Sequence, residues 1–179
     1  MSAIETTREI AIPSGTWTVD PSHSRVEFSI RHMGIASIRG SFADFDAVID
    51  GGDEPRISGA IRVASVDTRD EARDGHLQSP DFFDAERYPE MTFASTRFDD
   101  GKVVGDLTIR GITREVELVA TITGAGTDPW GNERLGIELD GEIDRHEFGV
   151  SWNTPLPTGG LLLGDTVRLT AGFSAVKGA

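Results

Sequence analysis

The chain has 179 residues, of which 30 are acidic and 17 basic, and its formal net charge is −13. This length suits one domain, and the negative charge argues against non-specific nucleic-acid binding, which depends on cations that neutralise phosphates. The lack of cysteine excludes disulfides, thiol nucleophiles and thiolate zinc sites.

The N-terminal residues MSAIETTREIAIPS are polar and mixed in charge. They lack the basic start, the apolar run and the small-residue cleavage site of a secretory signal. No apolar stretch elsewhere approaches the ~20 residues of a membrane-spanning helix. We therefore expect a flexible tail over 1–14, a single domain over 15–177 and a cytoplasmic location.

From Gly15 onward the sequence pattern is typical of an antiparallel β-protein. Short runs rich in Val, Ile, Thr and Phe are separated by Gly, Asp and Pro turns. Apolar side chains recur at every second position, most clearly over 26–30 and again over 103–109, 135–139 and 167–173. One face of each strand is therefore apolar and the other polar, as in antiparallel sheets.

Two stretches depart from this alternation. The apolar positions change phase between Phe42 and Phe45, which predicts a β-bulge near Ala43–Asp44. The stretch from Thr68 to Pro89 has no alternation and predicts one or two short helical turns, with Asp67 or Thr68 as the N-cap.

Eight or nine strands with short connections favour a closed barrel over an open sheet, because closure removes the exposed strand edges. An eight-stranded barrel is also about the smallest that can hold one ligand inside. The pattern therefore predicts an all-β fold of eight or nine strands, closed into an antiparallel barrel, with a short helical insert.

The chain offers little for catalysis or metal binding. Acidic clusters fall in turns or at helix starts, where Asp caps the backbone, and no serine stands in a nucleophile elbow. We expect no metal site, because no pair of histidines has zinc-motif spacing. His32 shares the inward phase of Phe28 and Ile30, which leaves either an interior hydrogen bond or a ligand contact open. The four histidines are His23, His32, His76 and His146.

Aromatic and aliphatic side chains also occur where no strand is predicted. Phe82 and Phe83 stand together in the helical insert, and Trp152 precedes the apolar run 161–163. Such residues either plug the end of a barrel or line the mouth of an apolar cavity. Adjacent residues on a helical turn splay by ~100°, so at least one phenylalanine leaves the barrel wall. We hypothesise that the pair acts as a lid.

Four blocks of sequence stand in a specific order and spacing. They are WTVDPSHSRVEFSIRHMGIASIRGSF at 17–42, RDGHLQSPDFFDAERYPEMTF at 73–93, GDLTIRGITREVEL at 105–118 and EIDRHEFGVSW at 142–152. Together they resemble the YceI-like family of lipocalin-like, polyisoprenoid-binding barrels, over about 15–175. The resemblance implies an elongated eight-stranded antiparallel lipocalin-like barrel with a short helical insert, enclosing a hydrophobic tunnel for a long prenyl chain.

The resemblance implies a binding protein, not an enzyme, with no catalytic residue and no cofactor. It implies head-group contacts for Arg31 and Arg39 and a polar role at the tunnel mouth for His32. The tunnel lining it implies is Phe28, Ile30, Phe42, Phe45, Phe82, Phe83, Met91, Phe93, Leu107, Ile109, Phe148 and Trp152.

The implied ligand is a polyisoprenoid or similar long-chain amphiphile, such as a prenyl diphosphate, a prenylquinone or a fatty acyl amide, held for carriage, storage or sequestration. Many relatives are exported, and the missing secretory signal shifts the expected ligand towards cytoplasmic isoprenoids or membrane-facing quinones. Two alternatives stay open: a hydrolase or isomerase that uses His32 inside the barrel, and a scavenger of lipophilic toxins. Because family members commonly pair, we also expect a homodimer.

Overall fold

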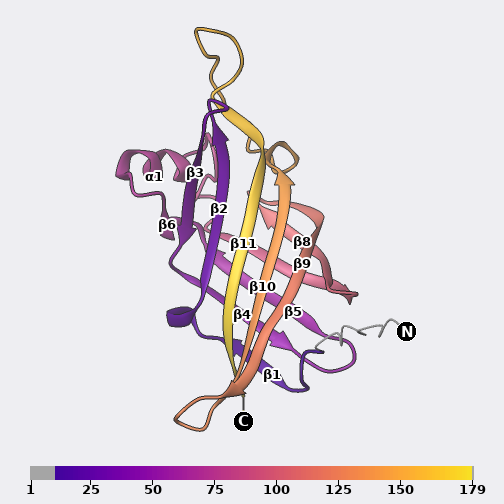
Figure 1. Ribbon diagram of the computed structural model, residues 1–179. Helices are drawn as coiled ribbons and strands as arrows, with labels where there is room; N and C mark the ends of the chain where they lie inside the picture. The colour runs from indigo at the N-terminus through magenta and orange to yellow at the C-terminus, as the bar shows by residue number, and fades with distance from the viewer. Residues whose placement is uncertain (1–10, 179) are drawn as a thin grey trace, which may run out of the picture.

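Strands dominate the computed structural model, which describes residues 11–178 (Figure 1). Three short 3-10 helices, η1 (Pro21–His23), η2 (Val63–Ser65) and η3 (Arg145–Phe148), and one α-helix, α1 (Glu71–Gln78), connect them. The strands are β1 (Thr16–Val19), β2 (Arg25–His32), β3 (Ala36–Phe42), β4 (Phe45–Asp50), β5 (Arg56–Arg62), β6 (Val66–Asp67), β7 (Glu90–Asp99), β8 (Lys102–Ile109), β9 (Ile112–Thr127), β10 (Glu133–Asp144) and β11 (Leu163–Lys177).

Eight of these strands close into a ring by antiparallel pairing. Their order is β1–β4–β5–β7–β8–β9–β10–β11, and β11 returns to β1 through pairs such as Val176 with Thr18. The prediction of an all-β, closed eight-stranded antiparallel barrel with one short helix is therefore confirmed.

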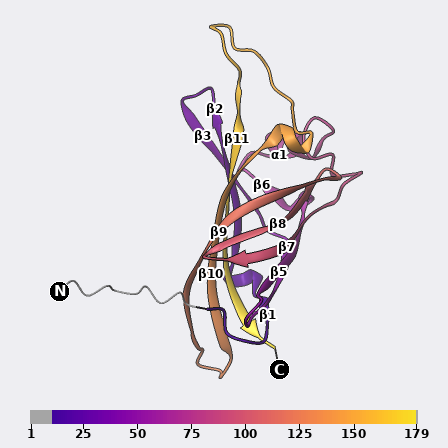
Figure 2. The same ribbon diagram turned by 90° about the vertical axis from the view of Figure 1, so that its right-hand side faces the viewer.

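The long strand β11 gives the barrel two distinct ends. Its C-terminal part pairs with β1, and its stretch from Leu163 to Gly172 pairs with β2, which in turn pairs with β3. We call the two ends the β1 end and the loop end. The loop end carries the β2–β3 turn, α1, η3 and the connection 153–162 before β11 (Figures 1 and 2).

The change of phase near Ala43–Asp44 is a corner between two strands. β3 ends at Phe42 and β4 begins at Phe45, and both phenylalanines are buried. The predicted bulge within one strand is therefore wrong. At this corner the chain leaves the pairing with β2 and joins the ring between β1 and β5, so both flanking strands keep their apolar face inward.

The helical insert forms as predicted, but its N-cap lies further along the chain. The side chain of Asp70 caps α1 by accepting a hydrogen bond from the Arg73 backbone N–H at 3.0 Å. Asp67 instead accepts from the backbone N–H two residues later, and Thr68 is buried. The prediction of Asp67 or Thr68 as the cap is therefore wrong, because Asp67 is the last residue of β6 and Thr68 lies in the connection that leads into the helix.

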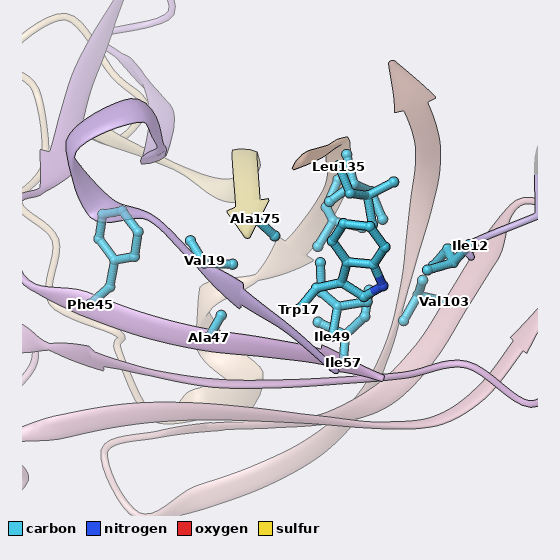
Figure 3. Close-up of a cluster of buried hydrophobic side chains, with 12 residues drawn as sticks. Ile12, Trp17, Val19, Phe45, Ala47, Ile49, Ile57, Val103, Leu135 and Ala175 are labelled. Atoms are coloured by element: carbon cyan, nitrogen blue, oxygen red, sulfur yellow. The ribbon is translucent and has the colours of Figure 1, made fainter. Parts of the chain in front are cut away.

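The β1 end is filled with apolar side chains (Figure 3). Ile12 is also buried there, and the indole Nε1 of Trp17 donates to the Pro13 carbonyl at 3.0 Å. The expected tail over 1–14 therefore ends too late, since Ile12 is buried against the barrel and the Pro13 carbonyl is bonded to Trp17, and residues 1–10 lie outside the described part. Residues exposed by at most 2% at this end are Ile12, Trp17, Ile49, Ile57, Val103, Leu135, Ile137 and Ala175.

Candidate functional site

An apolar cavity of about 240 Å³ occupies the loop end, and we call it the outer cavity. Its walls come from β2, β3 and β11, from α1 and the turn after it, and from η3 and the segment that follows. Its lining residues are Phe28, Ile30, His32, Ile38, Phe42, Arg73, His76, Leu77, Phe82, Phe83, Met91, Ile109, Ile143, Arg145, Phe148, Val150, Trp152, Leu162, Leu163, Val167 and Leu169.

A second apolar cavity of about 130 Å³, the inner cavity, lies deeper towards the β1 end. Phe45, Phe93 and Phe173 are among the side chains that line it. A waist of residues lines both cavities, so the two stand in series along the barrel. The waist consists of Phe28, Phe42, Met91, Ile109 and Leu169.

An aromatic cluster fastens the helical insert over the outer cavity. The ring centroid of His76 lies 5.0 Å from that of Phe82 and 4.8 Å from that of Trp152, both in edge-to-face geometry. Phe83 packs edge-on against Phe42 of the waist at 6.1 Å. Arg110 secures the same region, because its Nη1 donates to the Phe82 carbonyl at 3.0 Å. Both phenylalanines thus face the cavity, and their movement as a lid stays a prediction.

The polar side chains of the outer cavity are all bases. They are His32, Arg73, His76 and Arg145, and neither Asp nor Glu is among the lining residues. Arg73 donates from Nε to Thr68 Oγ1 at 2.8 Å and from Nη2 to the Thr68 carbonyl at 2.6 Å. Arg73 and Arg145 thus bring two positive charges to the cavity of a strongly acidic chain, and His76 Nε2 lies 2.9 Å from the carboxylate of Asp81.

Arg145 is the most buried of these bases, at 3% exposure. Its Nη1 donates to the carbonyls of Val150 and Trp152, and its Nε donates to that of Gly164. Within residues 11–178 no carboxylate lies within ion-pair distance of its guanidinium, and Nη2 has no hydrogen-bond partner. Burial lowers the pKa of Arg145, and the more distant charge of Asp165 partly opposes this shift.

The structure brings all the predicted tunnel-lining residues together around the two cavities. Phe45, Phe93 and Leu107 line the inner cavity alone. The other predicted residues line the outer cavity, including the waist, and they are Phe28, Ile30, His32, Phe42, Phe82, Phe83, Met91, Ile109, Phe148 and Trp152.

The structure does not bring Arg31 and Arg39 to either apolar cavity. Both side chains lie on the outer face of the barrel, along a polar groove that also includes Ser29 and Arg168. The reason is strand alternation, because Arg31 occupies the opposite phase of β2 from Ile30 and His32. The predicted head-group contact therefore has no support from the geometry of the cavity.

Sequence reasoning missed the basic side chains of the outer cavity and the part of its wall that β11 forms. The wall residues Val167 and Leu169 of β11 had a signal, since they alternate with polar neighbours. Arg73, His76 and Arg145 had none, because helices and turns place them. Within residues 11–178, no three His, Asp or Glu side chains gather closely enough to hold a metal ion.

Comparisons with known proteins agree with this architecture. The pattern described as "YceI-like domain" matches residues 17–175. A UPF0312 protein of Staphylococcus aureus (strain USA300) is 37% identical over 160 residues, which cover 87% of this chain and 94% of that protein. None of the helices in the described part is long and apolar enough to cross a membrane.

Solved structures share the fold. A YCEI protein of Campylobacter jejuni has a TM-score of 0.71 at 34% identity, over 84% of this chain and 91% of that one. BcnA of Burkholderia cenocepacia has a TM-score of 0.74 at 25% identity, over 87% and 98%. A polyisoprenoid binding domain from Saccharophagus degradans has a TM-score of 0.69 at 13% identity, over 90% and 98%, and so shows the fold alone. Because the family pattern spans most of the sequence, this chain belongs to the YceI-like family.

Proposed function

We propose that the protein binds a long-chain amphiphilic lipid, with its hydrocarbon tail in the two cavities and its head group at the basic loop end. The observation that carries this proposal is the apolar outer cavity of about 240 Å³. Protein interiors are ordinarily close-packed, with few voids larger than a water molecule. Together the two cavities reach the lower end of the ~300–1,000 Å³ typical of ligand pockets.

The tail supplies most of the binding free energy. Burying a C15 chain at ~0.8 kcal/mol per CH₂ gives about 12 kcal/mol before ordering costs, and association costs about 4–15 kcal/mol. A polyisoprenoid is the tail class we favour, supported by the YceI-like fold shared with the polyisoprenoid binding domain from Saccharophagus degradans. Shortening the tail should therefore weaken binding more than changing the head group does.

The basic side chains favour an anionic head group, such as a phosphate or a carboxylate. Arg73 and Arg145 line the outer cavity with no carboxylate within ion-pair distance among the described residues. A positive charge in an apolar, poorly hydrated site is stabilised by an opposite charge more strongly than it would be in water. Arg73 is the better placed of the two to meet a head group, because the side chain of Arg145 is almost wholly buried.

We propose binding and not catalysis. The His32 ring lines the cavity, but within residues 11–178 it makes no hydrogen bond to a carboxylate that would orient it as a general base. Carriage, storage and sequestration all fit a binding barrel. Homodimer formation and a cytoplasmic location stay predictions.

Tail-matched ligands test this proposal directly. We expect a prenyl phosphate to bind about tenfold more tightly than the prenyl alcohol with the same tail, which corresponds to ~1.4 kcal/mol. Arg73→Gln should abolish this preference and Arg73→Lys should keep part of it. Arg87→Gln is the matched control, because Arg87 is exposed on the same insert and faces Asp84. Titration calorimetry measures each affinity.

The native ligand is identified by mass spectrometry of lipid extracted from protein purified from its host. One class of long-chain lipid would support the proposal, and a chemically mixed set would favour the scavenger. A cavity without lipid, together with turnover of an ester or prenyl substrate that His32→Ala abolishes, would make the protein an enzyme.

A further inference from the structure

The loop end exposes a group of large apolar side chains. Met33 is 44% exposed, Ile35 78% and Leu161 56%. The Met33 backbone N–H donates to the Leu162 carbonyl at 2.7 Å, so the β2–β3 turn and the connection before β11 lie side by side. Figure 2 shows both segments projecting beyond the barrel at this end. We call residues 33–35 and 155–162 the apolar tip.

The apolar tip carries no charge, in a chain where 26% of residues are charged. No Asp, Glu, Lys or Arg occurs from Phe148 to Gly164 or from Met33 to Ile38. Large exposed apolar side chains grouped in this way mark an interaction site.

Three arginines lie just below the apolar tip on the outside of the barrel. Arg39 and Arg168 flank Ser29 on the neighbouring strands, and Arg31 stands two residues before Met33. At ~3.3 Å per residue, Arg31 lies about 7 Å and the row through Ser29 about 13 Å from Met33 along β2. In the described part of the chain none of the three has a carboxylate within ion-pair distance, although Glu27 and Glu142 line the same polar groove.

We propose that the loop end docks on an anionic lipid bilayer. The apolar tip inserts at the boundary between head groups and acyl chains, to the ~5–10 Å depth usual for interfacial segments. Arg31, Arg39 and Arg168 then meet lipid phosphates, which gives a role to three guanidinium groups that form no ion pair in the described part of a chain with net charge −13.

Docking would bring the cavity to the bilayer. His32, Leu162 and Leu163 line the outer cavity and adjoin or belong to the apolar tip. An amphiphile in the bilayer would then reach the cavity without crossing water. Only this delivery of cargo rests on the proposed function, because the docking contact itself needs no ligand in the barrel.

Vesicle co-sedimentation of the lipid-free, full-length protein tests the docking contact. We expect binding to phosphatidylcholine vesicles that contain phosphatidylglycerol, and weaker binding to phosphatidylcholine alone or at high salt. The double variant Ile35→Ser/Leu161→Ser should lose at least about tenfold in affinity for both vesicles. Arg31→Gln/Arg39→Gln should weaken binding to the anionic vesicles alone.

Two control variants carry matched changes elsewhere. Trp130→Ser removes a side chain that is 82% exposed on the turn between β9 and β10, at the β1 end, and Arg114→Gln removes an exposed charge on β9. Both should bind vesicles like the wild type. Wild-type protein that stays in the supernatant, or controls that lose as much binding as the tip variants, would overturn the proposal.

A second copy of the chain is the competing occupant of the apolar tip. If sedimentation velocity shows a dimer that Ile35→Ser/Leu161→Ser dissociates, with vesicle binding unchanged, the tip is a dimer interface and the proposal is wrong.

Binding of a prenyl phosphate in the absence of vesicles is measured on the same variants. If neither the wild type nor the variants bind the prenyl phosphate while the wild type still binds vesicles, the proposed function is wrong and the docking proposal is supported.

Discussion

The β1 end and the loop end are built from the same alternating strands, yet one is filled and the other is hollow. At the β1 end, Trp17 packs in one cluster with Ile49 and Leu135, all at most 2% exposed (Figure 3). At the loop end, α1 and η3 help to cover the outer cavity. Alternation thus decides which side chains face inward, and their size and direction decide whether they fill the barrel.

Glycines help to keep the lumen open, because aromatic rings lie over them. Phe28 pairs across strands with Gly40, and a Cβ at Gly40 would overlap the Phe28 ring. A Cβ at Gly105 would likewise lie 2.6 Å from Cζ of Phe93. Both rings therefore lie along the wall and leave the space in front of them to the cavities, whereas Trp17 at the β1 end projects into the core.

The largest expected effect compares one leucine at each end. Leu135→Ala in the filled β1 end should cost about 3–5 kcal/mol of unfolding free energy, because it leaves a cavity in a packed core. Leu169→Ala should cost only about 1–2 kcal/mol, because that side chain already borders a cavity, and it should weaken lipid binding instead. Urea unfolding of the lipid-free variants measures both values. Equal losses would mean that the loop end is as tightly packed as the β1 end.

A smaller effect on the unfolding free energy is expected from a substitution that moves the Phe28 ring away from the barrel wall. Gly40→Ala should push the Phe28 ring away from the wall and narrow the passage at the waist, at a cost of about 1–3 kcal/mol from overpacking. It should also weaken binding of long tails more than of short tails, because the waist separates the two cavities. Gly75→Ala is the control, since no atom lies near the added Cβ and alanine favours the helix by ~1 kcal/mol. Equal weakening for both tail lengths would argue against a continuous tunnel.

The sequence predicted the barrel and its apolar lining because both follow from local alternation. The inward phase of Phe28, Ile30 and His32 is visible in the chain and is the phase that the structure has. The cavity itself was not predictable in this way, since it depends on the space left between distant strands. Arg145 is the clearest example of a residue whose place could not be predicted. It is buried because the segments that fold over it supply three carbonyls that accept hydrogen bonds from its guanidinium.

The smallest expected effect is on the pH dependence of the unfolding free energy, and it arises from carboxylates at the β1 end. Arg134 lies 2.9 Å from Asp128 Oδ2 and 3.2 Å from Asp20 Oδ2. Hydrogen bonds from Ser22 and His23, followed by that from Arg134, hold the pKa of Asp20 well below its usual range, and Arg134 does the same for Asp128. Because both carboxylates bind protons less readily in the folded state, their stabilisation is complete above the unfolded pKa of ~3.9 and is lost as the pH falls below it.

Arg134→Gln should therefore flatten the decline of the urea midpoint between about pH 4 and pH 2, below the ordinary Asp pKa. It should leave lipid affinity unchanged, because Arg134 lines neither of the two apolar cavities. Arg56→Gln is the control, since Arg56 is exposed on β5 and its Nη1 donates to the Pro55 carbonyl. If the urea midpoint falls with pH equally in the wild type and in Arg134→Gln, these carboxylates do not determine how the stability of the barrel declines in acid.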